Sequence, residues 1–254
     1  MNKEDEEILQ EYPTPRASFA AFTLSLVLVV IIGSVLQFYA FLPGLYVTEW
    51  LLILGPPLVL LWRSKVSIKK SLGLQHFNVN PVLLGVVGGL GIYFVVLGLS
   101  YVMEGLLGPY PEVDIIEEAF PTTWLSFIPW ILALGFSAGV CEEILFRGFI
   151  QKGLHNYWGP LKAVVVTALL FGVFHLDPWR IPSAVLLGLF AGYLVVRTGS
   201  LYSAIVLHMT SNTFGQVLAF ADKLPKNSVQ WQLALAVALV LVFIVLVTAE
   251  KTKK

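Results

Sequence analysis

The sequence predicts an all-α, polytopic membrane protein with about eight transmembrane helices. Hydrophobic residues make up 57% of the 254-residue chain and charged residues only 13%, and the mean hydropathy is strongly positive. A soluble domain of this size would be hard to keep in solution with such a composition. The apolar residues also gather in runs of about 17 to 25 residues, which is the length that crosses a bilayer.

Eight such runs follow one another along the chain, with short polar connections between them. The longest connections cover residues 63–81 and 104–123, so we expect one integral membrane domain over residues 1–254 and no second domain outside the membrane. The runs cover residues 17–42, 46–62, 82–103, 124–147, 161–176, 181–196, 201–220 and 231–249.

Local signals support the individual runs. The first run is too long for the apolar core of a signal peptide and follows an acidic stretch over 2–16, so we expect no cleaved leader. Pro56 and Pro57 must bend or interrupt the second helix. Gly85 and Gly89 in the third run have the small-xxx-small spacing that lets membrane helices approach closely.

The fourth and fifth runs are joined at Gly159-Pro160, a strong turn signal that predicts a helical hairpin. Gly188 and Gly192 in the sixth run repeat the small-xxx-small spacing.

The basic residues predict the orientation, because cytoplasmic loops carry an excess of Lys and Arg. With eight spans and both termini in the cytoplasm, thirteen of the sixteen basic residues lie on the cytoplasmic side, leaving Arg180, Lys223 and Lys226 outside. We therefore expect an integral, multi-pass protein, in the cell membrane if the host is a prokaryote. The net charge of zero argues against a nucleic-acid partner.

Three ionisable residues, Glu142, Glu143 and Arg147, interrupt the fourth apolar run. Each such residue costs about 2.5 to 3.5 kcal/mol at the centre of a membrane helix, so the cluster must face protein or a water-filled cavity. Glu143 and Arg147 are four residues apart and share a helix face, which predicts an ion pair. Glu142 is turned about 100° away and is free to point elsewhere.

Two later helices each carry a pair of candidate site residues at the same four-residue spacing. Phe171 and His175 share one face of the fifth run, and His208 and Asn212 share one face of the seventh. Glu142 lies seventeen positions before Gly159 and His175 sixteen after it, so a hairpin places them level. We expect the three polar faces to meet in a cavity that opens to the cytoplasm.

These residue types suit the hydrolysis of an amide. Burial in a low-dielectric medium moves a carboxylate toward the range in which a general base works at neutral pH, so Glu142 is suited to deprotonating water. His175 can share that proton or hold the water, and His208 with Asn212 can donate hydrogen bonds to the negative oxygen of a tetrahedral intermediate. Cys141 is a weak candidate nucleophile, because the sequence places no histidine to activate it.

The ordered motifs Glu142-Glu143-x-x-x-Arg147, Phe171-x-x-x-His175 and His208-x-x-x-Asn212 resemble those of the CPBP family. This family comprises CAAX proteases and bacteriocin-processing enzymes, is also called Abi, and includes the type II CAAX prenyl endopeptidases. The resemblance covers about residues 124–220. It implies an intramembrane, glutamate-dependent protease in which Glu142 and His175 activate water and His208 and Asn212 form the oxyanion site. Glu143, Arg147 and Phe171 are then supporting residues.

The sequence is also compatible with other mechanisms and functions. We expect no cofactor and a metal-free mechanism, since no His-Glu-x-x-His motif is present; zinc is the rival within the enzyme class. A non-enzymatic immunity or scaffold protein, or a small proton-coupled transporter using Glu142, is the rival outside it. The substrate would be a peptide or protein, prenylated if the CAAX activity carries over, met in the lipid bilayer.

Overall fold

The computed structural model describes residues 13–74, 78–111, 119–221 and 228–251, and the regular elements in these parts are all helices. Each of the eight predicted apolar runs is largely helical, but the first is broken at Ala40, the second at Leu54, and the helix of the fifth ends at Phe174. Five helices in this part of the chain are long and apolar enough to cross a membrane. The protein is therefore an integral, multi-pass membrane protein, and the all-α prediction is confirmed.

The N-terminal helices form a long hairpin. Its first arm runs through α2 (Pro15–Leu28), the π-helical η1 (Val29–Gly33) and α3 (Ser34–Tyr39). Its second arm runs through α4 (Phe41–Val47), the π-helical η2 (Thr48–Ile53) and α5 (Gly55–Arg63), followed by the short α6 (Ile68–Ser71). The π-helical turns of η2 end just before Pro56 and Pro57, whose missing N–H groups interrupt the regular hydrogen-bond ladder.

The central part consists of α7 (Val79–Leu107) and a helix of 35 residues, Trp124–Trp158. That helix is made of α9 (Trp124–Ile131), the π-helical η3 (Leu132–Ser137), α10 (Ala138–Glu143), the π-helical η4 (Ile144–Gln151) and α11 (Lys152–Trp158). Its far end turns at Gly159, where φ is 79°, so the predicted hairpin with the next helix is present.

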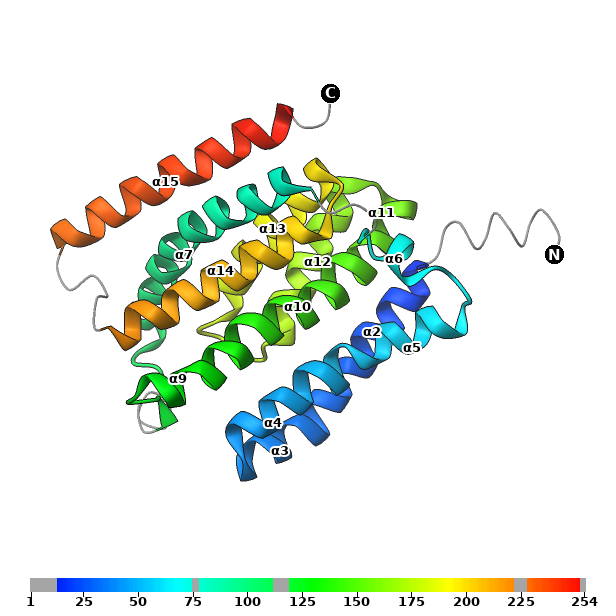
Figure 1. Ribbon diagram of the computed structural model, residues 1–254, viewed down its shortest axis with the longest axis horizontal. Helices are drawn as coiled ribbons and strands as arrows, with labels where there is room; N and C mark the ends of the chain where they lie inside the picture. The colour runs from blue at the N-terminus through cyan, green and yellow to red at the C-terminus, as the bar shows by residue number, and fades with distance from the viewer. Residues whose placement is uncertain (1–12, 75–77, 112–118, 222–227, 252–254) are drawn as a thin grey trace.

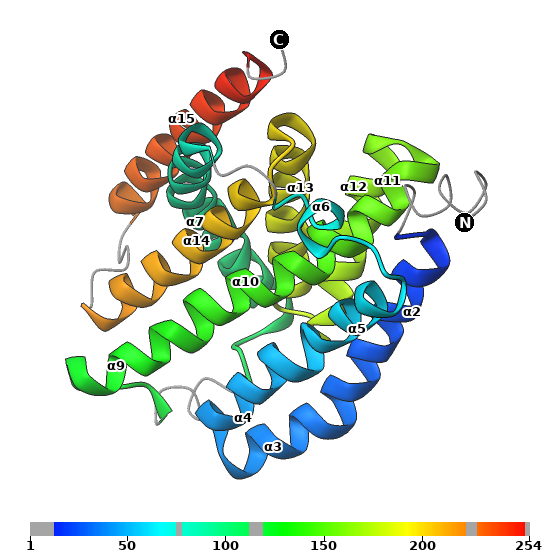
Figure 2. The same cartoon turned by 45° about the vertical axis from the view of Figure 1, so that its right-hand side comes forward.

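The last helices are α12 (Pro160–Phe174), α13 (Ile181–Thr198), α14 (Leu201–Phe220) and α15 (Ser228–Lys251). α14 lies between α7 and α10, and α15 lies on the outer side of α7 (Figure 1). Figure 2 shows α12 and α13 side by side, and α11 next to α2. The N-terminal hairpin covers the opposite side of the molecule from α15 and packs on α10 through η2.

Glycines allow the helices that form the core to approach closely. A Cβ added to Gly85 would lie 2.7 Å from the backbone oxygen of Ser203, and one added to Gly89 would lie 2.6 Å from that of Leu207. The small-xxx-small spacing in the third run therefore brings α7 against α14. Gly188 likewise brings α13 against α12, since a Cβ added to Gly188 would lie 3.1 Å from Ala168.

The two ends of the helix bundle differ in charge. The ends of α5, α11 and α13 gather at one end of the molecule together with α6 and the start of α2 (Figure 1). This basic end carries Arg16, Arg63, Lys65, Lys69, Lys70, Lys152, Lys162 and Arg197. Arg147, which the sequence assigned to the same set, is instead buried in the helix core.

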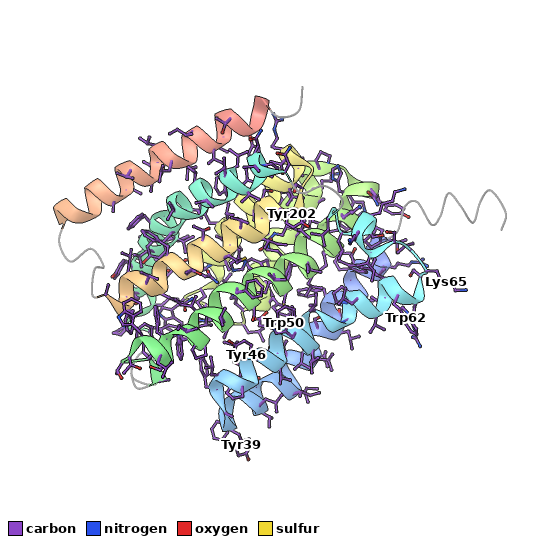
Figure 3. The ribbon with its side chains drawn as sticks, viewed as in Figure 1. Tyr39, Tyr46, Trp50, Trp62, Lys65 and Tyr202 are labelled. Carbon is purple, nitrogen blue, oxygen red and sulfur yellow. The ribbon has the colours of Figure 1, made fainter. Side chains whose placement is uncertain are left out.

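Aromatic side chains mark the two ends of the N-terminal hairpin. Trp62 and Lys65 lie at the basic end, and Tyr39 lies at the opposite tip (Figure 3). Both rings are largely exposed, as expected of anchors at the two membrane–water interfaces. The hairpin thus has the length and the ends of a pair of spanning helices.

Candidate active site

The paired carboxylates lie on α10, between two π-helical segments. π-Helical turns are uncommon and frequently lie at functional sites, because each adds a residue to a turn and redirects the side chains that follow. Gly135 and Gly139 on the preceding turns face Thr213 and Met209 of α14. A Cβ at Gly139 would lie 3.0 Å from the backbone nitrogen of Met209, so the two helices are in direct contact here.

Glu143 is the centre of a buried charge cluster. Its Oε1 atom accepts a hydrogen bond from Arg147 Nη1 at 2.7 Å and lies 2.8 Å from His208 Nδ1. Glu143 is fully buried and Arg147 is only 1% exposed. The predicted ion pair is therefore present, and it holds His208 as a third member that helical spacing did not predict.

Phe171 packs against this cluster. The guanidinium carbon of Arg147 lies 4.4 Å from the centre of the Phe171 ring, within range of a cation–π interaction. The edges of His175 and His208 contact the same ring, with centroid separations of 4.9 and 5.8 Å. Phe171 thus packs against the Arg147 guanidinium and against the rings of both histidines, and helps to hold them in position.

The hydrogen bonds of His175 and Asn212 occupy one nitrogen position on each side chain and so determine which atoms can interact with a substrate or a water molecule. His175 Nδ1 lies 2.9 Å from the carbonyl oxygen of Phe171, and a carbonyl can only accept, so Nδ1 carries the proton. Nε2 of a neutral His175 is then an acceptor. Asn212 Nδ2 donates to the carbonyl oxygen of Leu134 at 2.9 Å, which leaves its second N–H for another partner.

One cavity of about 340 Å³ is lined by all four predicted catalytic residues, Glu142, His175, His208 and Asn212. Glu142 is 9% exposed, and its Oε2 atom is buried without a hydrogen-bond partner. The predicted meeting of three polar helix faces therefore occurs. Glu143 and Arg147 do not line the cavity. They lie behind His208, which contacts the Glu143 carboxylate.

Sequence reasoning missed another carboxylate on the same cavity, Glu49 of η2. Its side chain is buried, and its Oε2 atom also lacks a hydrogen-bond partner. The signal was present in the sequence, because Glu49 is the one acidic residue in the apolar run 46–62. An ionisable residue inside a membrane helix is by itself a reason to suspect a functional site.

The cavity extends toward the end of the bundle opposite the basic end. α12 starts near Lys162 at the basic end and ends at Phe174, so His175 lies at its far end. The cavity continues from His175 to Arg180, whose side chain is 55% exposed. Arg180 pairs with Asp177 at 3.2 Å, and Tyr110 donates a hydrogen bond to the same carboxylate at 2.8 Å.

The motif-bearing segment also matches a known protein family. Residues 124–214 match the family model described as type II CAAX prenyl endopeptidase Rce1-like. This segment is an Rce1-like domain. A search of curated proteins and a search of solved structures each returned no match.

The Rce1-like domain contains every site residue predicted from the sequence, and it ends close to the predicted limit of residue 220. The predicted family is thereby confirmed for this segment. Its name implies protease activity and peptide substrates. Glu49 lies outside the matched segment, on the hairpin that closes the cavity from the other side.

Among the residues that the structure describes, no group of three or more His, Cys, Asp or Glu side chains is arranged to hold a metal ion. Cys141 is buried in the apolar core and does not line the cavity of the Rce1-like domain.

Proposed function

We propose that this protein is an intramembrane endopeptidase in which Glu142 activates a water molecule for attack on a peptide bond. One observation carries the proposal: the residues of three separate motifs of the Rce1-like domain line a single cavity. Glu142 takes a proton from water as the oxygen bonds to the carbonyl carbon. The acceptor nitrogen of His175, fixed by its bond to Phe171, holds that water in place.

The oxyanion that forms is stabilised by the side chains on α14. Asn212 supplies its second amide N–H, held in direction by the first. His208 can donate from Nε2 only as an imidazolium, because the proton on Nδ1 is already directed at Glu143. The carboxylate of Glu143 stabilises that positive charge, so Glu143 and Arg147 act on the reaction through His208.

We further propose eight membrane spans, with both termini and the basic end in the cytoplasm. This orientation revises the expected cytoplasmic opening, because the cavity reaches the surface at Arg180, at the opposite end of the bundle. Substrates would then enter from the exterior side, as peptides or as segments of membrane proteins. The name of the family makes isoprenylated C-terminal peptides one class to test.

Comparison of the membrane peptidome of cells carrying the wild type with that of cells carrying Glu142→Gln tests the activity and identifies substrates together. We expect peptides or truncated proteins that are present with the wild type and absent with the variant. A Glu142→Gln strain that loses a transport function with no change in any peptide would favour the proton-coupled transporter instead.

The proposed mechanism needs no metal, and this is testable directly. Dialysis of the purified protein against a chelator should leave peptide cleavage unchanged, and elemental analysis should find no stoichiometric zinc. Activity that is lost on chelation and restored by zinc would contradict the proposal.

A further inference from the structure

Glu49 is placed on the cavity by the way η2 is anchored. Tyr46 donates a hydrogen bond to the backbone oxygen of Pro129 at 2.8 Å, and Trp50 Nε1 donates to Ser137 Oγ at 2.9 Å. Figure 3 shows both side chains between the N-terminal hairpin and the helix that carries α10. These two bonds fix the rotation of η2, and Glu49 lies between them in the sequence.

Glu49 and Glu142 then face one cavity from opposite helices. Glu49 is 3% exposed, each residue has a buried Oε2 atom without a hydrogen-bond partner, and η2 packs directly against α10. The other titratable or charged groups on this cavity are His175, His208 and Arg180, and Cys141 directly precedes Glu142.

The charges of the site balance only if the two carboxyl groups hold one proton between them. Glu143 is neutralised by Arg147, and it also stabilises the charge that His208 takes up in the proposed mechanism. A second carboxylate beside Glu142 would add an uncompensated negative charge in a low-dielectric interior, which is strongly unfavourable. Two carboxyl groups that share a proton titrate as a pair.

We infer that Glu49 and Glu142 form a proton-sharing carboxyl pair, in which Glu49 is a further catalytic residue that protonates the leaving amine. This inference rests on the proposed peptidase function. Glu142 takes the proton of the attacking water as the carbon–oxygen bond forms. When the carbon–nitrogen bond breaks, its electron pair goes to nitrogen, which takes the proton of Glu49, and the proton on Glu142 then restores the pair.

Infrared difference spectroscopy of the purified protein at neutral pH tests the pair without relying on activity. The carbonyl stretch of a protonated carboxylic acid should be present in the wild type and lost in both Glu49→Gln and Glu142→Gln. Glu104→Gln, at an exposed position on α7, is the matched control and should not change this band. A band that is unchanged in Glu49→Gln overturns the inference.

Glu49→Asp serves if Glu49→Gln does not fold, since it keeps a carboxyl group. Its band should shift because the shorter side chain holds its carboxyl group at a different distance from Glu142, and an unshifted band also overturns the inference.

Steady-state kinetics of peptide cleavage test the catalytic role of Glu49. Glu49→Gln should lower kcat by about 10²- to 10⁴-fold, as loss of a general acid does, and should remove the alkaline limb of the pH profile of kcat/KM. An unchanged kcat with an unchanged alkaline limb would contradict the catalytic role. If the infrared band behaves as expected but the wild type cleaves no peptide, the pair stands and the peptidase function fails.

Discussion

At the residue scale, the least expected feature of the site is that one oxygen atom of Glu143 serves both Arg147 and His208. Spacing along one helix predicted the contact with Arg147, because residues four apart share a face. It could not predict the contact with His208, which comes from a helix 65 residues later and depends on how α10 and α14 pack. For the same reason the sequence did not connect Glu49 with Glu142.

This arrangement predicts that Glu143 and His208 act as one unit in catalysis. We expect Glu143→Gln to lower kcat chiefly because His208 can no longer be held as a donor. A double-mutant cycle on the purified enzyme measures this: combining Glu143→Gln with His208→Ala should cost no more than His208→Ala alone. Losses that multiply independently would contradict the coupling.

Glu143→Gln should also lower the free energy of unfolding, by about 3 to 5 kcal/mol, because Arg147 is left buried without its countercharge. Kinetic constants must therefore be measured on the fraction that elutes as folded protein.

Asn212→Ala tests the proposed oxyanion donor. Loss of one such donor typically lowers turnover by about 10²- to 10³-fold. Because the donor acts on charge that develops only in the transition state, kcat should fall far more than KM rises. Steady-state kinetics decide the matter, and a variant with a raised KM and a normal kcat would assign Asn212 to substrate binding instead.

At the element scale, composition and turn signals predicted the long helices but neither the short α6 nor the irregular turns within the long helices. The positions of Gly159 and of the apolar runs were enough to predict the hairpin of α11 and α12. The π-helical segments η2, η3 and η4 have no period that the sequence would reveal, and each lies inside a longer helix. The close contact at Gly139 was missed because its partner, Met209, is distant in the sequence.

Gly139→Val should separate the helices that carry Glu142 and His208. The added side chain would meet the backbone of Met209, with Cβ 3.2 Å from its Cα atom, and overpacking of this kind costs about 1 to 3 kcal/mol. The midpoint temperature of thermal unfolding in detergent and the rate of peptide cleavage should both decrease. Gly98→Val is the control, since nothing lies within 4 Å of its added Cβ, and it should leave both nearly unchanged. Equal effects of the two variants would contradict the packing argument.

At the scale of the whole molecule, hydropathy and charge predicted a polytopic protein with one basic end. The sequence analysis expected the cavity to open at the basic end, whereas the cavity reaches the half-exposed Arg180 at the opposite end of the bundle. The opening depends on where α12 ends and α13 begins, and Arg180 lies at that junction.

Cysteine labelling tests this orientation in a Cys141→Ala background. Pro178→Cys, beside the opening, should react with an impermeant thiol reagent added to intact cells. Lys69→Cys, on α6 at the basic end, should react only in inverted vesicles. The reverse pattern would place the opening in the cytoplasm.

The central claim is that Glu142 activates water for peptide hydrolysis, and turnover by the purified, reconstituted protein tests it most directly. Wild type and Glu142→Gln are compared on peptides identified from the membrane peptidome and on isoprenylated C-terminal peptides. We predict that the wild type cleaves at least one of them and that Glu142→Gln, folded as judged by circular dichroism, loses about 10²- to 10⁴-fold in kcat. A folded Glu142→Gln protein with near-normal turnover would contradict the claim.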